Sequence, residues 1–247
     1  MRSLVALALF ASSLAAAVDG TVMNRTAGKP QAGALVTLYK LGEAGMQPVS
    51  AAKSSAEGKF RFEETIQGPH LLQTIYSGVT YTQMIPPGSP SSDLTVEVFD
   101  TSAKPDSTKV SQHMILLEPT ENQLVVSENI LYQNRGNRTY NDPAGGTVKV
   151  FLPETTKGVA HVMVTAPGGM PVQRSLSKTS QANVFKIDFP VKPGETRFDI
   201  SYSVPFSSPG SFASKVLEKD SPVRLIVPAG VTLAGDGLEP LGQEPST

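Results

Sequence analysis

Glycine and proline interrupt this sequence so often that long helices have little room to form. The chain of 247 residues contains 21 glycines and 20 prolines. Glycine weakens a helix interior and proline breaks it, whereas both residues are common in the turns that join short strands. The hydrophobic fraction of 39% is nevertheless enough for packed cores. The pattern therefore predicts an all-β protein.

Between these interruptions, apolar residues recur at every second position, which is the period of a β-strand. Residues 34–39 alternate in this way, and residues 198–204 show the cleanest alternation, with Phe, Ile, Tyr and Val set against Asp and Ser. Strands that follow one another at intervals of about ten residues, with Gly/Pro turns between them, are typical of β-sandwiches. We therefore expect sandwich domains.

One predicted strand carries a polar interruption at its centre. Residues 124–132 place apolar side chains on both faces of a long strand, and only Glu128 and Asn129 break these faces near the middle. Because successive side chains of a strand point to opposite faces, Glu128 and Asn129 interrupt different faces.

The first 17 residues have the composition of a secretory signal peptide. Arg2 supplies the positive charge, residues 4–14 form an apolar stretch, and residues 15–17 are three alanines suited to a cleavage site. A buried N-terminal helix is the alternative, but the segment has no amphipathic period. We expect cleavage after Ala17 and export to the periplasm, the cell envelope or the extracellular space. No later stretch reaches the roughly 18 apolar residues of a membrane span, so we expect none in the mature chain.

The rest of the chain divides into two β-rich blocks. Residues 18–100 form the first predicted sandwich and residues 110–206 the second. Residues 101–109 are polar, contain a proline and lack an apolar pattern, so we interpret them as a linker. Residues 207–247 contribute one further strand, at residues 223–227, and a Gly/Pro-rich tail that is expected to be disordered.

The first block carries a recognisable pattern in four segments: Asp19-Gly20-Thr21-Val22, Ala27-Gly28-Lys29-Pro30, residues 32–38 and residues 56–62. This pattern resembles the carboxypeptidase regulatory-like domain, closely over residues 18–78 and less closely to residue 100. The resemblance implies a prealbumin-like sandwich with a carbohydrate-binding-like fold, found in bacterial exported proteins and without catalytic residues of its own. It also implies that Ala34, Val36 and Leu38 pack inward. An aromatic residue often follows the Gly-Pro turn in this family, and His70 stands there instead.

The second block resembles a β-domain of exported proteins from environmental bacteria. The resemblance is carried by Gly194-Glu195-Thr196, Phe198 and residues 201–206. Longer members of that type continue past a strand similar to residues 223–228 toward a C-terminal membrane helix. The present chain has no such helix, so we interpret it as a shorter or truncated member.

The absence of cysteine excludes several chemistries at once. Disulfides, thiolate zinc sites, iron–sulfur clusters, cysteine nucleophiles and a bacterial lipoprotein anchor all require this residue. An exported chain without disulfides also favours a bacterial origin. The 21 basic and 22 acidic residues nearly balance, so the sequence has no electrostatic footprint for nucleic acid or an anionic membrane.

No catalytic, cofactor-binding or metal-binding residue can be assigned from spacing. His70, His113 and His161 are scattered, and none has a second ligand at a metal-site interval. Two Ser-x-x-Lys motifs, residues 50–53 and 175–178, lie among predicted strands rather than at the start of a helix. We therefore expect no metal, no cofactor and no enzyme activity.

Two further motifs have structural interpretations. Residues 152–156 (LPETT) resemble a sortase sorting signal, but they lie in mid-domain, where we expect a strand end turned by proline. Asn24 and Asn137 begin glycosylation sequons in predicted turns, and a sequon matters only in a eukaryotic secretory route.

These features predict a non-catalytic, exported or cell-envelope module that binds or spaces other components, with an envelope protein or a polysaccharide as its partner. Two alternatives remain. A secreted or periplasmic hydrolase with a dispersed triad would show a deep pocket with convergent His, Ser and Asp. A carbohydrate-binding module would show exposed tyrosines over polar groups.

Overall fold

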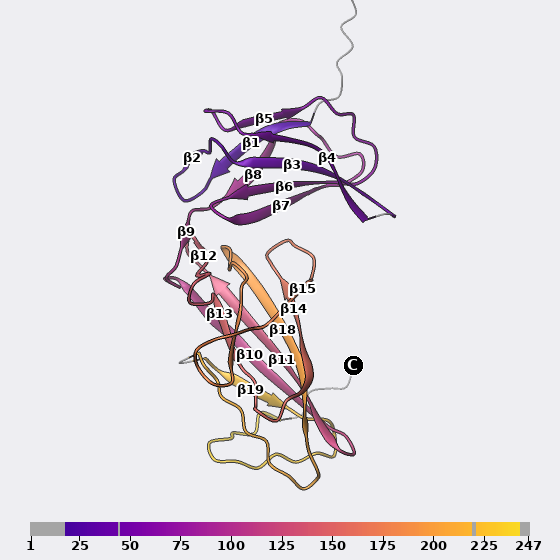
Figure 1. The fold of residues 1–247 in the computed structure, drawn as a ribbon, viewed down its shortest axis with the longest axis vertical. Coiled ribbons are helices and arrows are strands. Elements are labelled where there is room, and N and C mark those ends of the chain that lie inside the picture. Colours follow the sequence, from indigo (N-terminus) through magenta and orange to yellow (C-terminus); the bar gives the residue numbers. More distant parts are fainter. Residues whose placement is uncertain (1–17, 44, 219–220, 243–247) are drawn as a thin grey trace, which may run out of the picture. The chain divides into compact units, whose positions relative to one another are not determined.

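The computed structural model describes residues 18–43, 45–218 and 221–242. The expected signal peptide, residues 1–17, lies outside the described residues. The all-β prediction is confirmed, because the described residues form strands, turns and loops and contain no helix. The chain divides into two compact units, Met1–Thr101 and Ser102–Thr247, which are described separately below (Figure 1).

The first unit is a sandwich of two sheets. Its strands are β1 (Val18–Asn24), β2 (Lys29–Pro30), β3 (Leu35–Gly42), β4 (Gly45–Lys53), β5 (Lys59–Phe62), β6 (His70–Tyr76), β7 (Val79–Ile85) and β8 (Leu94–Val98). One sheet is built on β1, which pairs antiparallel with β2 and β5 and parallel with β8. The other sheet has the antiparallel order β4–β3–β6–β7.

Alternating apolar side chains fill the space between these two sheets. Val22 on β1, Val36 and Leu38 on β3, and Leu72 on β6 are completely buried. Ala34, just before β3, is buried with them. The inward packing of Ala34, Val36 and Leu38 that the resemblance implies is therefore observed. Each of the buried valine and leucine side chains contributes on the order of 1.5–3 kcal/mol of hydrophobic stabilisation.

The turn before β5 requires glycine for two reasons. Gly58 has φ of +73°, and its N–H bonds to the Ser55 carbonyl at 2.9 Å. A Cβ at this position would lie 2.8 Å from the Val22 carbonyl oxygen and from the Pro30 side chain. A side chain here would therefore meet both backbone strain and a direct clash.

A partly buried polar network ties three segments of the first unit together. Asn24, at the end of β1, donates from Nδ2 to Asp100 Oδ1 at 2.8 Å, and the Tyr76 hydroxyl donates to the same oxygen at 2.8 Å. Asn24 Oδ1 accepts from the backbone N–H groups of Thr26 and Ala27. Burial and the carboxylate of Asp100 raise the pKa of Tyr76. Because the Asn24 amide is 2% exposed and bonded on both sides, this sequon is structural.

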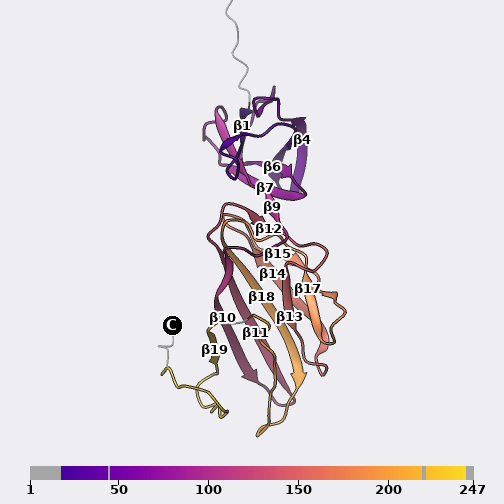
Figure 2. The same cartoon turned by 90° about the vertical axis from the view of Figure 1, so that its left-hand side faces the viewer.

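The second unit contains a long sheet and a short one. Its strands are β10 (Thr108–Pro119), β11 (Gln123–Asn134), β12 (Thr139–Tyr140), β13 (Val148–Phe151), β14 (Lys157–Thr165), β15 (Val172–Arg174), β16 (Ser177–Lys178), β17 (Val184–Ile187), β18 (Gly194–Pro205) and β19 (Val223–Ile226). The long sheet has the order β15–β14–β18–β11–β10–β19, and the short sheet has the order β13–β17–β16. Figure 2 shows β13 and β17 as a layer beside the long sheet.

The core of the second unit lies against the inner face of the long sheet. Phe198 is completely buried, and its ring meets those of Tyr132 and Phe189 edge-on at 5.5 and 6.1 Å. Val148 and Ile187 reach this core from the short sheet. The short sheet has fewer strands than the long one and packs against only one face of it, the inner face. The opposite, outer face of the long sheet carries half-buried and exposed side chains.

The expected linker contains more strand than its composition indicates. Of residues 101–109, the first two form β9 (Thr101–Ser102) and the last two begin β10. Thr108 is buried and pairs with Asn134, because a β-branched residue fits a strand whatever the polarity of its neighbours. The role of the segment as a linker between domains stays a prediction.

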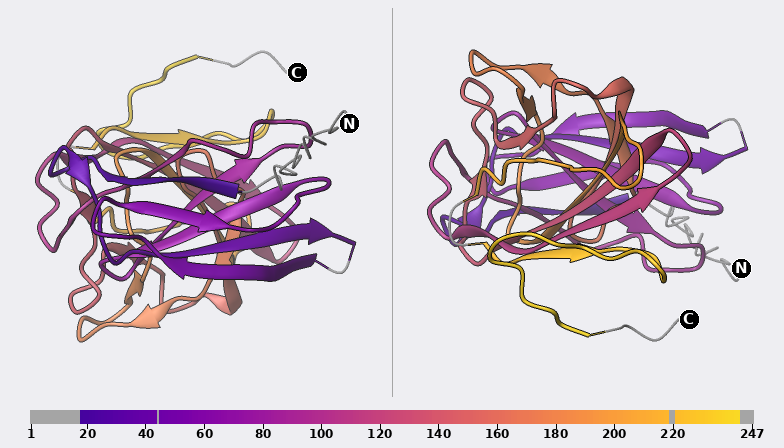
Figure 3. Two further views of the ribbon diagram at one scale, coloured as in Figure 1. Left: turned by 90° about the horizontal axis from the view of Figure 1, so that it is seen from above. Right: turned by 90° about the horizontal axis from the view of Figure 1, so that it is seen from below.

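Each unit joins its first strand to its last in parallel. In the first unit β1 pairs with β8 over five residue pairs, Gly20↔Leu94 to Asn24↔Val98. In the second unit β10 pairs with β19 over four, His113↔Val223 to Leu116↔Ile226. β19, yellow in Figure 3, lies within the segment for which the sequence predicts a further strand and forms one edge of the long sheet.

Candidate functional site

The polar interruption of β11 marks the centre of the candidate site. Glu128 and Asn129 are adjacent on this strand, and β11 lies between β10 and β18 in the long sheet. Glu128 points into the core and is 7% exposed, whereas Asn129 belongs to the outer face. The two residues therefore organise separate polar groups on the two sides of one sheet.

On the inner face, Glu128 bonds to two neighbouring strands. Its Oε2 accepts from His113 Nε2 on β10 at 2.9 Å, and its Oε1 accepts from the Tyr202 hydroxyl on β18 at 2.8 Å. The Glu128 carboxylate thus bridges β10 and β18 through two hydrogen bonds. Burial first, and the charge of Glu128 second, raise the pKa of Tyr202 far above its ordinary value. All three side chains of this cluster are buried, so the cluster is part of the core.

A second tyrosine of the inner face is held in a similar way. The hydroxyl of Tyr132 donates to Glu218 Oε1 at 2.8 Å. Burial, followed by the nearby charge of Glu218, raises the pKa of Tyr132 well above its ordinary value. The segment after β18 also contributes Phe212, which packs against the core. This irregular segment thus helps to cover the inner face of the long sheet.

On the outer face, Asn129 bonds to its cross-strand neighbour. Asn129 Nδ2 donates to Asp199 Oδ1 at 2.6 Å, and Arg197 Nε donates to Asp199 Oδ2 at 2.9 Å. Both oxygens of the Asp199 carboxylate are therefore occupied, and its charge is balanced by a neighbouring guanidinium.

The strand register arranges the outer face in rows that cross the sheet. Directly paired residues share a face, so the ladders of β14, β18, β11, β10 and β19 define these rows. One row reads His161, Ser201, Ser127, Leu116 and Ile226. The next row reads Met163, Asp199, Asn129, Met114 and Arg224. A groove of about 360 Å³ lies over these two rows.

The outer face brings His161, Ser201 and Asp199 near one another, which is the set a dispersed triad would need. His161 and Ser201 are direct cross-strand neighbours, at Cβ separations of about 5 Å. However, no hydrogen bond joins His161 to Ser201 or to Asp199 among the described residues, and Asp199 is committed to other partners. A triad requires the carboxylate to orient the imidazole, so this arrangement is not one.

The surroundings of Ser201 also lack the usual support for acyl transfer. Ser201 lies in the middle of β18, and β18 is hydrogen-bonded on both sides, to β11 and to β14. An oxyanion hole needs donors aimed at the developing charge, and the N–H groups of a central strand are already used in its ladders. The groove is also open rather than a deep pocket.

The three histidines lie apart. His70 is buried at the start of β6, where its Nδ1 donates to the Gly68 carbonyl at 3.1 Å. His113 belongs to the inner face of the long sheet and His161 to its outer face. No group of three or more His, Asp or Glu side chains that could hold a metal ion occurs in the described ranges.

The Ser-x-x-Lys motifs are placed on strands and loops. Ser50 and Lys53 lie on β4 three positions apart, and their partners on β3 are Leu38, which is buried, and Leu35, which is not. The serine and the lysine therefore face opposite sides of the sheet. Ser175 precedes β16, and Lys178 ends it. The first pair therefore cannot act as nucleophile and base, and neither motif opens a helix.

Two further motifs have structural roles. The LPETT segment follows β13, and Thr156 donates from both its N–H and its hydroxyl to the Pro153 carbonyl, which closes a turn. All six tyrosines are buried or half-buried, so no exposed tyrosine platform is available for sugar stacking.

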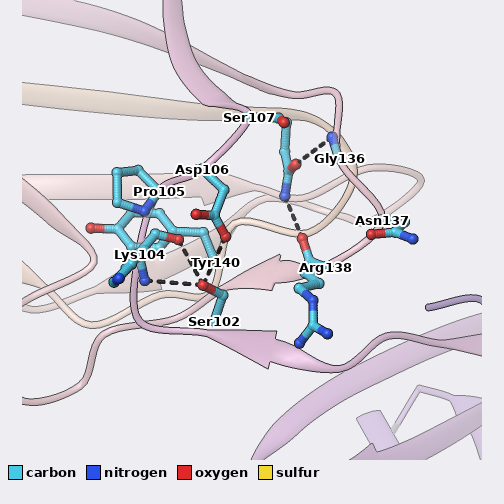
Figure 4. A pocket seen from close by; sticks show the side chains of 10 residues that line it. Ser102, Lys104, Pro105, Asp106, Ser107, Gly136, Asn137, Arg138 and Tyr140 are labelled. Carbon is cyan, nitrogen blue, oxygen red and sulfur yellow. Dashed lines mark hydrogen bonds between the residues drawn. The ribbon is translucent and has the colours of Figure 1, made fainter. Parts of the chain in front are cut away.

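A second and much smaller pocket of about 70 Å³ lies between the loops that follow β9 and β11 (Figure 4). Its polar groups bond to one another. Ser102 Oγ donates to Asp106 Oδ2 at 3.0 Å, and Asn134 Nδ2 donates to the Arg138 carbonyl at 2.8 Å. Small-molecule sites start at about 300 Å³, so this pocket reflects the ordering of two loops. Asn137, which begins the second glycosylation sequon, is exposed at this pocket.

The described part of the chain holds no helix with the length and hydrophobicity of a membrane span.

Comparison with known proteins gives distant structural matches only. No protein-family model matches the chain, and no curated protein matches it. A double mutant of the shaft pilin SpaA from Lactobacillus rhamnosus GG matches at 10% identity and a TM-score of 0.26, over 88% of this chain and 99% of that chain. The minor pilin GBS52 of Streptococcus agalactiae matches at 12% identity and a TM-score of 0.26, with the same coverage.

A third match is a proposed carbohydrate-binding protein of Bacteroides uniformis. It has 9% identity and a TM-score of 0.24, over 77% of this chain and 79% of that chain. Such values assign neither a family nor a function to this chain.

Proposed function

We propose that the chain is a non-catalytic, exported module that binds or spaces components of the bacterial cell envelope, with the outer face of the long sheet as its binding surface. The observation that carries this proposal is the groove of about 360 Å³ across that face. Its polar side chains are bonded to one another or left open to solvent, and they are not arranged for catalysis.

The first unit is proposed to act as a carboxypeptidase regulatory-like domain that serves as a spacer. The sequence pattern of residues 18–78 and the inward packing of Val36 and Leu38 support this assignment. The partly buried network of Asn24, Tyr76 and Asp100 ties together the end of β1, the end of β6 and the segment after β8. The polar groups of this network bond to one another, as expected for a domain whose role is structural.

The division into two domains belongs to the same proposal. Loops with little buried surface are cut first by proteases. Limited proteolysis of the mature protein is expected to cut between residues 98 and 112 and to release two stable fragments. First cuts elsewhere, with this segment left intact, would contradict the boundary.

The non-catalytic part can be tested directly. The purified mature protein is screened against peptidase, esterase and glycosidase substrates, with and without zinc, and treated with a fluorophosphonate probe. We expect no turnover and no labelled serine. Stoichiometric labelling of one serine, or turnover that is lost when a histidine is replaced, would contradict the proposal.

A hydrolase is the second candidate, because His161 and Ser201 are direct cross-strand neighbours. In that case the probe would label Ser201, and His161→Ala would abolish the labelling. Replacement of His70, which lies in the other unit, is the matched control and would leave labelling unchanged.

The binding surface can be tested in cells. A photo-crosslinking amino acid is placed at Leu116 in the groove or at Val49, an exposed position of the first unit. We expect a discrete crosslinked product from position 116 and none of the same size from position 49. Equal products from both positions would show that the groove is not the contact surface.

A further inference from the structure

The two sheets of the first unit differ in the charge of their outer faces. On the sheet built on β1, Asp19 pairs with Arg61, and Lys59 and Glu97 belong to the neighbouring rows of the same face. Arg61 Nη1 lies 3.7 Å from Asp19 Oδ2. Interspersed charges of both signs are typical of a surface that faces water. This face therefore has the composition of a solvated surface.

The outer face of the sheet β4–β3–β6–β7 is almost free of charge. Val36, Leu38 and Leu72 point into the core, so the residues that alternate with them face outward. The strand ladders place these residues on the outer face, row by row: Lys53, Leu35, Ile75 and Thr80; Ala51, Thr37, Gln73 and Thr82; Pro48, Tyr39, Leu71 and Met84; Met46 and Leu41. Among them, Lys53 alone carries a charge. This surface is called the β3–β6 face below.

Exposed apolar side chains gather on the same sheet. In the described part of the first unit, the large apolar residues that are more than a third exposed all belong to β3, β4, β6 or β7, and they are Leu35, Met46, Val49, Ile75 and Met84. The sheet built on β1 contributes none of them. An exposed apolar patch of this kind marks an interaction surface on a soluble domain.

The β3–β6 face is large enough for a weak interface. It spans four strands and extends along β3 from Leu35 to Leu41. Strand spacing and rise per residue give it dimensions of roughly 19 Å by 24 Å, or about 450 Å². Two such faces in contact would remove roughly 900 Å² from water, which is at the low end of specific interfaces and typical of reversible association.

The chemistry of the β3–β6 face favours another uncharged sheet as its occupant. A face with one charge offers little attraction to a nucleic acid, an acidic polysaccharide or an anionic lipid surface. A neutral sugar would stack on an exposed aromatic ring, but Tyr39 is half-buried and its hydroxyl donates to Gln73 Oε1 at 3.2 Å. In β-sandwiches, by contrast, the apolar face of one sheet is covered by the face of a second sheet.

We infer that two copies of the chain pair through their β3–β6 faces in a weak, two-fold symmetric dimer. A second copy supplies a face of the same size and the same lack of charge, and a two-fold contact needs only one self-complementary surface. Lys53 lies on the edge strand β4 in the first row of the face. A two-fold axis near the centre of the face would therefore keep the two lysines at opposite corners. The inference goes beyond the proposed function, because it concerns the first unit rather than the groove of the second.

The test follows self-association of the full mature protein by sedimentation equilibrium. We expect a reversible equilibrium between monomer and dimer, with a Kd on the order of 100 μM for an interface of this size. Added salt should not weaken the dimer, because no ion pair is expected to hold the two faces together. NMR of the methionine methyl groups locates the contact. The shifts of Met46 and Met84 should depend on protein concentration, and the shift of Met23 on β1 should not.

Single substitutions test the face directly. Ile75→Lys and Met84→Lys each change an exposed side chain, so both variants are expected to fold. Each brings like charges into an apolar contact and should weaken dimerisation by about 10-fold or more. Thr95→Lys, at an exposed position of β8 on the charged sheet, is the matched control and should leave the Kd unchanged. The photo-crosslinker at Val49 should join two copies of the chain, in a product that differs in size from the product at Leu116.

Three results would overturn the inference. The first is a protein that stays monomeric over the whole concentration range, and the second is a dimer that Ile75→Lys and Met84→Lys leave unchanged. The third is a set of concentration-dependent shifts at Met114 or Met163 in place of Met46 and Met84, which would put the contact on the long sheet. Binding to phosphatidylcholine vesicles without dimerisation would also reject the dimer and would identify a lipid-facing surface instead.

Discussion

The inner and outer faces of the long sheet use the same kind of side chain for opposite purposes. Glu128 and Asn129 are neighbours on β11, yet Glu128 is enclosed with His113 and Tyr202 while Asn129 meets Asp199 beside an open groove. A buried charge is tolerated only when its partners are in place, whereas a polar group at the surface can exchange its partner for water. The inner cluster therefore fixes the structure, whereas the outer one lies beside a groove that is open to solvent.

The largest expected effect is a loss of stability when the inner cluster is disrupted, and the same change on the outer face should cost much less. Glu128→Ala leaves His113 and Tyr202 buried without their acceptor, so it should lower the free energy of unfolding by about 3–5 kcal/mol. Asn129→Ala is the matched control on the same strand and should cost less than about 1 kcal/mol. Urea denaturation followed by circular dichroism measures both. Equal midpoints for the two variants would contradict the assignment of faces.

A triple variant sharpens this prediction. Replacing His113 and Glu128 by leucine and Tyr202 by phenylalanine removes the whole inner cluster, and no buried group is then left unpaired. Apolar replacements of this kind are often neutral or stabilising. We expect the triple variant to be more stable than Glu128→Ala. A triple variant as unstable as the single one would show that the loss reflects packing rather than the missing acceptor.

The next effect depends on pH, and its main contributions are expected from the two buried tyrosines of the inner face. The pKa values of Tyr132 and Tyr202 are raised by burial from an ordinary value of 10.0. Above pH 10 the unfolded chain loses these protons while the folded chain keeps them, so stability falls as pH rises. The expected loss is about 1.4 kcal/mol per pH unit for each tyrosine. Denaturation midpoints between pH 9.5 and 11.5 measure this slope.

Two controls belong with the pH series. Tyr132→Phe combined with Tyr202→Phe should flatten the decline, whereas Asn129→Ala should leave it unchanged. Burial also lowers the pKa of Lys192 from 10.5 to about 8. The unfolded chain therefore binds more protons than the folded one between these values, and stability rises with pH over that range. A decline that starts well below pH 10 would not come from the tyrosines.

The smallest effect is expected on the outer face. His161→Ala and Ser201→Ala change side chains that form no hydrogen bond with each other among the described residues, so each should alter stability by no more than about 0.5 kcal/mol. Thermal denaturation of the second unit measures the change. A loss as large as that of Glu128→Ala would show that this row has a structural role like that of the inner cluster.

The sequence predicts where the strands lie better than it predicts which strands pair and which residues they bring together. Alternation identifies residues 34–39 and 198–204 as strands because burial of one face leaves a period of two in the sequence itself. The interruption at Glu128 and Asn129 is also visible, and it marks both polar clusters. Their partners are not visible, because His113 and Tyr202 come from strands whose register is set by pairing across the whole sheet.

The groove could not be predicted for the same reason. His161, Ser201 and Leu116 share a row only because β14, β18, β11 and β10 pair in one particular register. A shift of one residue in any of these ladders would turn a side chain to the other face. Composition alone predicts a linker at residues 108–109, because it does not show that Thr108 faces Asn134.

The parallel pairing of first and last strands has a mechanical consequence. In each unit the chain enters at one end of a parallel ladder, β1–β8 or β10–β19, and leaves at the other end. Tension on the two ends of the unit would slide these strands past each other and load all hydrogen bonds of the ladder together. An antiparallel hairpin pulled from its open end would instead break them one after another. Both units are therefore built to resist stretching along the path of the chain, which is the load that a spacer between anchored components bears.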